Sequence, residues 1–250
     1  MIKVENVFKS FNGETVLDNI SVVFEEGKTN LIIGQSGSGK TVLMKSIVGL
    51  HVVDSGSIYY HERDFVPMSI KQKQQLRKEM GMLFQGGALF DSFTVEENVR
   101  FPLDMFSNLT LAERRKRVDF CLERVNLSKV HSLFPAELSG GMQKRVAIAR
   151  AIVQNPKYLF CDEPNSGLDP ITALVIDDLI SDITHEFNIT TIVNTHDMNS
   201  VMEIGEKIVF IHKGKKYWEG SNAEILNSDN KTLNDFVFAS NLAKKIKENL

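Results

Sequence analysis

The feature of this sequence that most constrains its fold is a glycine-rich loop that ends in a lysine and a threonine. The loop reads Gly34-Gln35-Ser36-Gly37-Ser38-Gly39-Lys40-Thr41 and fits the pattern G-x-x-x-x-G-K-[ST] in full. An apolar run, Leu31 to Ile33, stops directly before the loop, and residues 41–50 continue with helical spacing. A strand, a glycine loop and a helix in this order predict an α/β fold with a phosphate site at the loop.

The residue types in this loop suit the binding of phosphates. Glycines let backbone amides approach a phosphate where a Cβ would obstruct them, and the following helix directs the partial positive charge of its N-terminus at the same point. Lys40 supplies a charge for the outer phosphates, and the Thr41 hydroxyl is placed to bind Mg²⁺. We therefore predict a site for a nucleotide and Mg²⁺.

Two carboxylates are predicted at the end of a second buried strand. Four apolar or aromatic residues, 158–161, precede Asp162 and Glu163. We expect Asp162 to hold the Mg²⁺ shell and Glu163 to polarise the attacking water as a general base. Because side chains alternate along a strand, we expect the two acids to point in different directions.

Two more polar residues follow predicted strands. The β-branched run 191–194 leads to His196, which is placed to hydrogen-bond a terminal phosphate. Gln85 follows the strand pattern 81–84, from where it could reach the metal or the water. Since Gln85 also begins a helical insert, we expect it to couple occupancy of the site to the orientation of that insert.

A second phosphate-binding element lies far downstream, at Leu138 to Gln143. Ser139 followed by Gly140 and Gly141 is typical of a helix N-cap with free amides. An ordinary capped helix without a ligand shows the same pattern, so two interpretations stay open for this segment alone. With two phosphate elements in one chain, we expect a nucleotide to be enclosed from opposite sides, one of them supplied by another subunit.

Composition narrows the class of partner. The 250 residues suffice for one large domain or two small ones, and a formal net charge of −3 argues against a dedicated nucleic-acid-binding protein. No run reaches the roughly 18 consecutive apolar residues of a membrane-spanning helix, and no secretory signal is expected at the start. Work at a membrane is therefore expected to need a partner. Cys121 and Cys161 are interpreted as buried free thiols.

The order of the patterns predicts an α/β core interrupted by a helical insert. The first part of the chain shows the patterns of short strands, and about residues 86–155 show the patterns of helices. Strands resume at residue 158 and end in a hairpin-like pair around Gly214. We expect the helical tail, 221–250, to pack on its own domain or on a neighbouring subunit, with interfacial membrane binding as the alternative. Its last part places one apolar face on Ala239, Leu242, Ala243, Ile246 and Leu250.

Together these residues resemble the ATP-binding-cassette (ABC) family. They correspond to its Walker A (34–41), Q-loop (Gln85), signature (138–143), Walker B (158–163), D-loop (166–169) and switch histidine (His196). The order is that of the family, and the likeness covers roughly residues 1–220. Phe11 stands where the family has an aromatic residue that stacks on adenine. Asn165 departs from the D-E-P-T-S-G pattern, in which Thr is more frequent.

The resemblance implies a P-loop NTPase (RecA-like) core with an antiparallel β subdomain and a helical insert. It also implies an ATPase that uses ATP and Mg²⁺ and works as a homodimer, in which the signature of one subunit covers the γ-phosphate held by the Walker A of the other. Glu163, His196 and Gln85 would be catalytic. Thr41, Gln85 and Asp162 would hold the metal. The nucleotide contacts would come from Phe11, the whole loop 34–41, Ser139, Gly140, Gly141, Gln143 and Asp169.

The stretch after Gln85 resembles one branch of the family most. Its sequence Gly86-Gly87-Ala88-Leu89-Phe90 looks like the ATPase subunit of bacterial Mla/Mce-type phospholipid transporters. That implies a peripheral protein at the cytoplasmic face of the bacterial inner membrane, with permease subunits near residues 86–93 and an Mce-type lipid-binding partner. Leu89, Phe90 and Phe93 would line a docking groove, or else form the core of the insert. Two other functions stay open: the ATPase of a polar amino-acid importer, and a non-transport member such as an iron-sulfur assembly ATPase.

Overall fold

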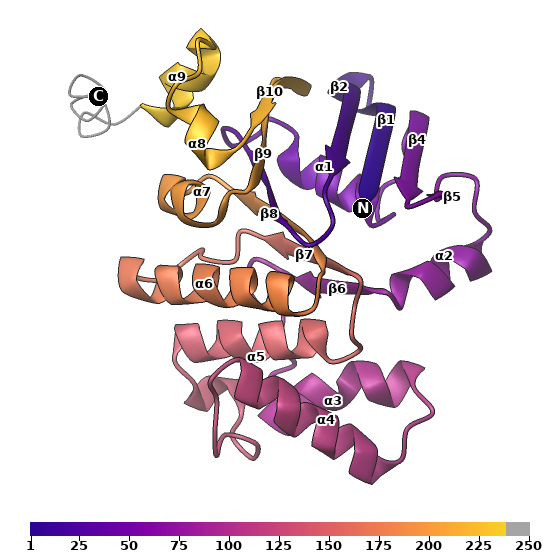
Figure 1. Cartoon of the computed structure of the whole chain (residues 1–250). Coiled ribbons are helices and arrows are strands. Elements are labelled where there is room, and N and C mark those ends of the chain that lie inside the picture. Colours follow the sequence, from indigo (N-terminus) through magenta and orange to yellow (C-terminus); the bar gives the residue numbers. More distant parts are fainter. Residues whose placement is uncertain (239–250) are drawn as a thin grey trace.

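The structure, a computed structural model, describes residues 1–238, and these form two β-sheets (Figure 1). One sheet has the strand order β2-β1-β4-β5, and the other has the order β10-β9-β3-β8-β7-β6. The strands are β1 (Ile2–Phe11), β2 (Glu14–Phe24), β3 (Thr29–Ile33), β4 (Ser55–Tyr60), β5 (Arg63–Asp64), β6 (Met80–Leu83), β7 (Tyr158–Asp162), β8 (Thr190–Thr195), β9 (Lys207–His212) and β10 (Lys215–Gly220). The helices are α1 (Lys40–Ile47), α2 (Ile70–Arg77), α3 (Val95–Phe106), α4 (Leu111–Arg124), η1 (Pro135–Glu137, a 3-10 helix), α5 (Gly140–Ile152), α6 (Pro170–Glu186), α7 (Met198–Ile204), α8 (Asn222–Ile225) and α9 (Lys231–Val237). The predicted α/β fold, with a separate antiparallel subdomain, is confirmed.

The second sheet brings the predicted site residues to one edge. Its strands β9, β3, β8, β7 and β6 pair in parallel with one another in this order, and β10 pairs with β9 in the antiparallel direction. In this register Ile33 lies beside Thr195, and Asp162 lies beside Asn194. The loops that follow β3, β7 and β8 therefore emerge together at the carboxyl ends of the strands, where open α/β sheets bind their ligands.

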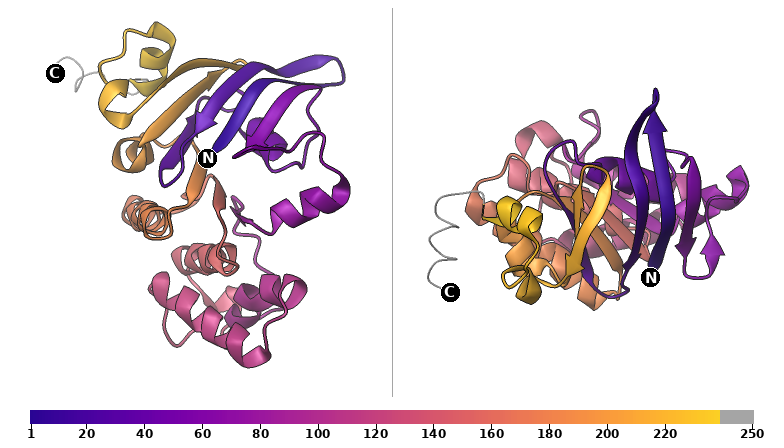
Figure 2. Two further views of the ribbon diagram at one scale, coloured as in Figure 1. Left: turned by 45° about the vertical axis from the view of Figure 1, so that its right-hand side comes forward. Right: turned by 90° about the horizontal axis from the view of Figure 1, so that it is seen from above.

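Two hydrophobic cores cover the two faces of this sheet. Side chains alternate along β3, so Ile32 enters the core shared with β1, β2, β4 and α1, whereas Leu31 and Ile33 enter the core shared with α3 to α6. Figures 1 and 2 show the antiparallel sheet and α1 on one side of the molecule, and α5 and α6 on the other with α3 and α4 beyond them. The central sheet is thus covered on both faces, and burial of its apolar side chains stabilises the layers.

The helical stretch after Gln85 consists of α3, α4, η1 and α5. Thr110 caps α4 in a capping box with Glu113. Arg117 of α4 donates to the carbonyl oxygens of Ile152 and Val153, at 3.0 Å each, and so attaches α4 to the end of α5.

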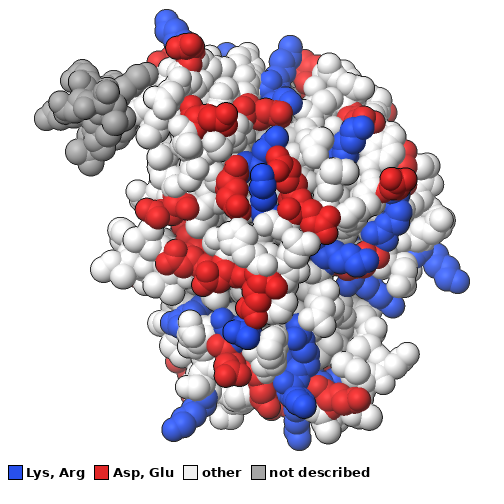
Figure 3. Space-filling view, in the orientation of Figure 1, with Lys and Arg blue, Asp and Glu red and all other residues white. Residues whose placement is uncertain are grey.

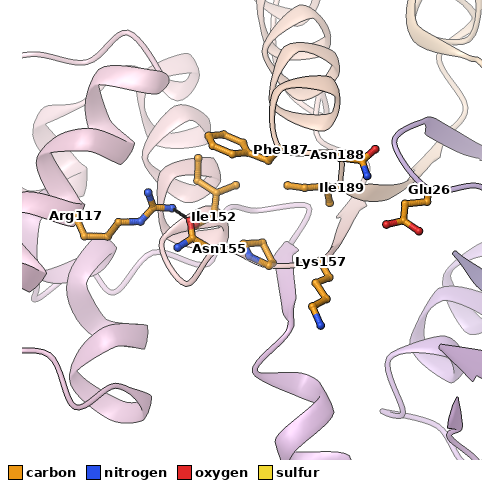
Figure 4. Close-up of a pocket in the computed structure, with 9 residues that line it drawn as sticks. Glu26, Arg117, Ile152, Asn155, Lys157, Phe187, Asn188 and Ile189 are labelled. Carbon is orange, nitrogen blue, oxygen red and sulfur yellow. Dashed lines mark hydrogen bonds between the residues drawn. The ribbon is translucent and has the colours of Figure 1, made fainter. Parts of the chain in front are cut away.

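A pocket beside this contact lies away from the loop-bearing edge of the sheet. Figure 4 shows Arg117 and Asn155 facing Phe187 and Ile189 across it, with Lys157 nearby. Because Lys157 directly precedes β7 and Ile189 directly precedes β8, the pocket is at the amino ends of these strands. It is therefore distinct from the candidate site described below.

The chain after Gly220 forms α8 and α9, whose Ile225, Leu233 and Val237 join the core shared with α3 to α6. The apolar face predicted from Ala239 to Leu250 lies outside the described residues, so its packing stays a prediction. No helix within residues 1–238 is long and apolar enough to cross a membrane. Acidic and basic side chains are interspersed over the face in Figure 3.

Asp177 places a carboxyl group inside the protein, on α6. It is 1% exposed, and its Oδ1 has no hydrogen-bond partner among the described residues. Desolvation raises the pKa of Asp177 from 3.8 to about 6, and hydrogen bonds from Ser200 and Asn165 oppose this rise. The ionised form of Asp177 is therefore costly to bury.

We expect Asp177→Asn to stabilise the protein above pH 6. An acid with a folded-state pKa above its unfolded value takes up a proton on folding, so the folded state loses stability as the pH rises from about 4 to about 6. A pKa higher by about 2 corresponds to about 3 kcal/mol at most. Urea unfolding should show a gain of about 1–3 kcal/mol at pH 8 and a smaller gain at pH 5. Exposed Asp182 on the same helix, changed to Asn, is the control; an equal gain from Asp177→Asn at both pH values would contradict the argument.

Candidate functional site

The glycine loop lies between β3 and α1, as predicted. A Cβ on Gly34 would lie 2.2 Å from the main-chain oxygen of Ile211, so only glycine fits at this position. Gly39 has a φ of 107° in the left-handed region that favours glycine, and it is the N-cap of α1. Both the packing of the fold and the approach of a phosphate therefore favour glycine at these positions.

Lys40 is folded back over the loop. Its Nζ donates to the carbonyl oxygens of Gly34 at 2.8 Å and Gln35 at 3.0 Å. Burial lowers the pKa of Lys40, and the carboxylates at the end of β7 oppose this effect. The Oγ of Ser38 is buried and has no partner among residues 1–238. A polyphosphate fits this cradle, because its oxygens would accept hydrogen bonds from Lys40 and Ser38.

Asp162 is the last residue of β7. The Nδ2 of Asn194 donates to its Oδ1 at 3.0 Å and holds the carboxylate at the sheet edge. Sequence reasoning missed Asn194 as a site residue. Asn194 stands near the end of a predicted strand, which was a hint of a site residue. Only the pairing of β8 with β7 shows that this strand end lies beside Asp162.

These residues fit Mg²⁺. Within the described part of the chain, no group of three or more His, Cys, Asp or Glu side chains could hold a metal ion. Mg²⁺ needs no such group, since one or two carboxylates, waters and substrate phosphates commonly hold it. Asp162 and the Thr41 hydroxyl meet this need next to the phosphate loop. The amide of Gln85 is turned towards Glu163 and Ser166, so its contact with the metal stays a prediction.

Glu163 is oriented by a tight turn. β7 ends at Asp162, and Glu163 has a φ of 47° in the left-handed region. The prediction that strand alternation orients Glu163 was therefore wrong. Nδ1 of His196 lies 3.1 Å from its Oε1, and Nε2 of Gln85 donates to its Oε2 at 3.3 Å. The structure thus brings together the three residues predicted to be catalytic.

An open hollow lies beside Glu163. It is lined by Glu163, Asn165, Ser166, Gly167, Thr195, His196, Asp197 and Met198. Nε2 of Gln85 also donates to the Oγ of Ser166 at 3.3 Å. Asn165, the departure from the family pattern, donates through Nδ2 to the Oγ of Ser200 at 3.1 Å and so ties the turn after Glu163 to α7.

Ser139 caps α5, as predicted. Its Oγ accepts a hydrogen bond from the main-chain nitrogen of Met142 at 3.3 Å, and the residue is exposed. Nε2 of Gln143 donates to the carbonyl oxygens of Pro135 at 2.9 Å and Leu138 at 3.3 Å, which supports the turn before α5. The predicted contact of Gln143 with a nucleotide stays a prediction.

The start of α5 packs beside the start of α6. A Cβ on Gly140 would have a Leu168 methyl as its nearest neighbour, at 3.7 Å, whereas a Cβ on Gly141 would lie 2.6 Å from a methyl of Thr172. Asp169 caps α6, and the hydrogen bond from the Thr172 hydroxyl lowers the pKa of Asp169. Gly140 is thus open to an approaching molecule, whereas Gly141 is closed by its own chain.

The two phosphate elements do not meet within the chain. Among residues 1–238 no hydrogen bond joins loop 34–41 to segment 138–143. Phe11, at the end of β1, is 38% exposed, and its ring makes an edge contact with His51 at 5.2 Å. Its stacking on adenine stays a prediction.

Comparisons with known proteins agree with this geometry. Residues 17–166 match the family model described as "ABC transporter". The chain is 38% identical over 237 residues to the methionine import ATP-binding protein MetN of Clostridioides difficile, covering 95% of this chain and 74% of that protein. It is 36% identical over 237 residues to the intermembrane phospholipid transport system ATP-binding protein MlaF of Haemophilus influenzae, covering 95% of this chain and 90% of that protein.

A solved structure extends the likeness to three dimensions. It is a dimeric ATP-binding cassette in a post-hydrolysis state, bound to ADP and phosphate. It superposes with a TM-score of 0.80 at 32% sequence identity, covering 89% of this chain and 99% of that one. The chain therefore belongs to the ABC transporter family, as an ATPase subunit that binds and hydrolyses ATP.

Proposed function

We propose that two copies of the chain enclose two ATP molecules and drive a permease that moves phospholipid between bacterial membranes. The observation that carries the proposal is the surface after Gln85, whose sequence resembles phospholipid-transport ATPases and which exposes the ring of Phe90. Each half of the proposal, the composite ATP site and the lipid-transporting partner, rests on separate residues.

The composite site rests on the exposed start of α5. Ser139 and Gly140 make no hydrogen bond with the phosphate loop of their own chain, and they lie at a helix N-terminus, where backbone amides lack partners within the helix. A two-fold dimer would place this helix start against the phosphate loop of the other copy and complete two identical sites. The related cassette of known structure is dimeric, which supports this arrangement.

The chemistry proposed for each site is hydrolysis of the terminal phosphate. Mg²⁺, when bound by Asp162 and Thr41, would neutralise charge on the phosphates. Lys40 would hold the outer phosphates, and Glu163 would accept a proton from the water that attacks the γ-phosphorus as its bond to the ADP oxygen breaks. His196 and Gln85 already contact Glu163, so they are placed to hold the water and the carboxylate in line.

The docking surface is an apolar hollow at the junction of core and insert. It is lined by Met80, Gly81, Met82, Phe84, Ala88, Phe90, Phe101, Pro102, Arg150, Ala151 and Gln154. Phe84 and Phe90 are 42% and 41% exposed, and the ring of Phe90 contacts that of Phe101 at 4.9 Å. Two of the residues predicted to line the groove do not line this hollow: Leu89 packs on the core, and the ring of Phe93 contacts that of Phe90 at 5.1 Å. A permease helix with an apolar face fits such a hollow.

The substrate class rests on the likeness to MlaF and on the Gly86-to-Phe90 run. MetN is similar to this chain at a slightly higher identity, so an amino-acid importer is the second candidate. In either case we place the chain at the cytoplasmic face of the bacterial inner membrane, held there by its permease. An Mce-type lipid-binding protein is the further partner expected of a phospholipid transporter.

We expect the complex purified from native membranes to contain a permease, an Mce-type protein and bound phospholipid. Native mass spectrometry of the complex identifies the lipid and the subunits. Phe90→Asp should release the permease, because it places a charge in the apolar hollow. Exposed Tyr217 on β10, changed to Asp, is the matched control and should leave the complex intact. A solute-binding protein in place of the Mce-type protein, with ATP hydrolysis stimulated by methionine, would instead establish the importer.

A further inference from the structure

Two basic side chains of α5, Lys144 and Arg150, donate hydrogen bonds to the main chain of the segment that follows β6. Nζ of Lys144 donates to the carbonyl oxygen of Gln85. Arg150 donates to the carbonyl oxygens of Gly87 at 2.6 Å and Ala88 at 2.7 Å. Both cations therefore bind the backbone of the segment 85–88, which we call the glutamine segment.

Lys144 is an unusual lysine because it is inside the protein. It is 6% exposed, and among residues 1–238 the Gln85 carbonyl is its one hydrogen-bond partner. Burying an ammonium group is costly unless it is paired or hydrogen-bonded. Lys144 therefore needs the Gln85 carbonyl, and any displacement of the glutamine segment from α5 would leave the ammonium without its hydrogen-bond acceptor.

The glutamine segment has an uncommon backbone conformation at the two residues that Arg150 contacts. Gly87 and Ala88 both have positive φ, at 74° and 48°. A positive φ is strained for alanine and persists only where the surroundings impose it. The carbonyl oxygens of these two residues accept the two hydrogen bonds that Arg150 donates, and these bonds help to hold the conformation. The guanidinium also lies 6.0 Å from the centre of the Phe90 ring, at the docking surface.

We propose that Lys144 and Arg150 are positioning residues that fix the glutamine segment to α5. The first turn of α5 carries Ser139 and Gly140, so the helix start, the side chain of Gln85 and the docking surface would move as one body. Because Gln85 contacts Glu163 and Ser166 on the core, a shift of this body changes the contacts of the candidate base. The consequence for transport rests on the proposed composite site, but the attachment itself does not.

The positioning role of Lys144 and Arg150 could not be predicted from the sequence. Lys144 and Arg150 are six residues apart on one helix, and Lys144 stands between Gln143 and Arg145. Charged residues on a helix usually belong to a solvated face. Only the packing of the glutamine segment against α5 shows that these two cations point inward.

Hydrogen exchange on the isolated full-length chain tests the attachment. Lys144→Met keeps the length of the side chain and removes the ammonium, so amides of residues 84–90 should exchange about tenfold faster, while those of loop 34–41 keep the wild-type rate. Arg145→Met, which removes a partly exposed cation from the same helix, should change neither segment. Unchanged exchange in residues 84–90, or faster exchange throughout the chain, would overturn the proposal. This measurement needs neither dimer nor permease, so it is independent of the proposed function.

A double-mutant cycle on ATP hydrolysis tests the positioning role. Lys144→Met should lower kcat about tenfold with KM for ATP unchanged, since a displaced contact slows chemistry more than binding. Gln85→Ala should also lower kcat, and the double variant should be no slower than Gln85→Ala alone, because Lys144 acts through Gln85. Losses that multiply in the double variant would show that Lys144 acts independently of the Gln85 side chain and would refute the positioning role.

Discussion

Glu163→Gln is expected to lower steady-state ATP hydrolysis by about 10²–10⁴-fold, the contribution typical of a positioned general base. Glutamine keeps the shape of the side chain and one acceptor oxygen for His196, but it cannot take a proton from water. Lys40 and Asp162 are untouched, so we expect ATP binding to survive. With ATP bound and hydrolysis stopped, the variant should persist as a closed dimer, which size-exclusion chromatography with light scattering detects.

The control for this experiment is Glu203→Gln. Glu203 is an exposed glutamate on α7, and the same change there should leave both hydrolysis and dimerisation at wild-type levels. Near-normal turnover by Glu163→Gln would show that Glu163 is not the general base.

A mixed dimer of Lys40→Ala and Gly140→Ala subunits is expected to recover hydrolysis that both pure variants lack. In composite sites the mixed dimer has one site with both defects and one site with neither. If each chain used its own helix start instead, both sites of the mixed dimer would be defective. We expect each pure variant to lose about 10²-fold in rate, as for the loss of one preorganised donor, and the mixed dimer to regain about half of the wild-type rate.

Gly140 is the better probe of the partner because its own chain leaves room for a methyl group. The nearest atom to its added Cβ would be at 3.7 Å, an ordinary contact, whereas Gly141→Ala would force a 2.6 Å clash with Thr172. Thermal unfolding should therefore be unchanged in Gly140→Ala. A mixed dimer as slow as the two pure variants would falsify the composite site.

The individual segments of the site could be predicted from local sequence patterns. Each of Gly34, Asp162 and His196 comes at or just after the end of a short buried strand, and the structure places all three at one edge of the parallel sheet. The N-cap role of Ser139 was equally local, since it depends on three following residues. The expected orientation of Glu163 was wrong because strand alternation was applied beyond Asp162, the last residue of β7.

The sequence by itself determined the fold class, the phosphate loop and the family, because these depend on residue types at short, fixed spacings. Only the tertiary structure decided which side chains share the site. Asn194 meets Asp162 through strand pairing, and Lys144 meets Gln85 across 59 positions of the chain. Such contacts arise from the packing of α5 and β8 against their neighbours, and packing between distant segments leaves no local pattern to detect.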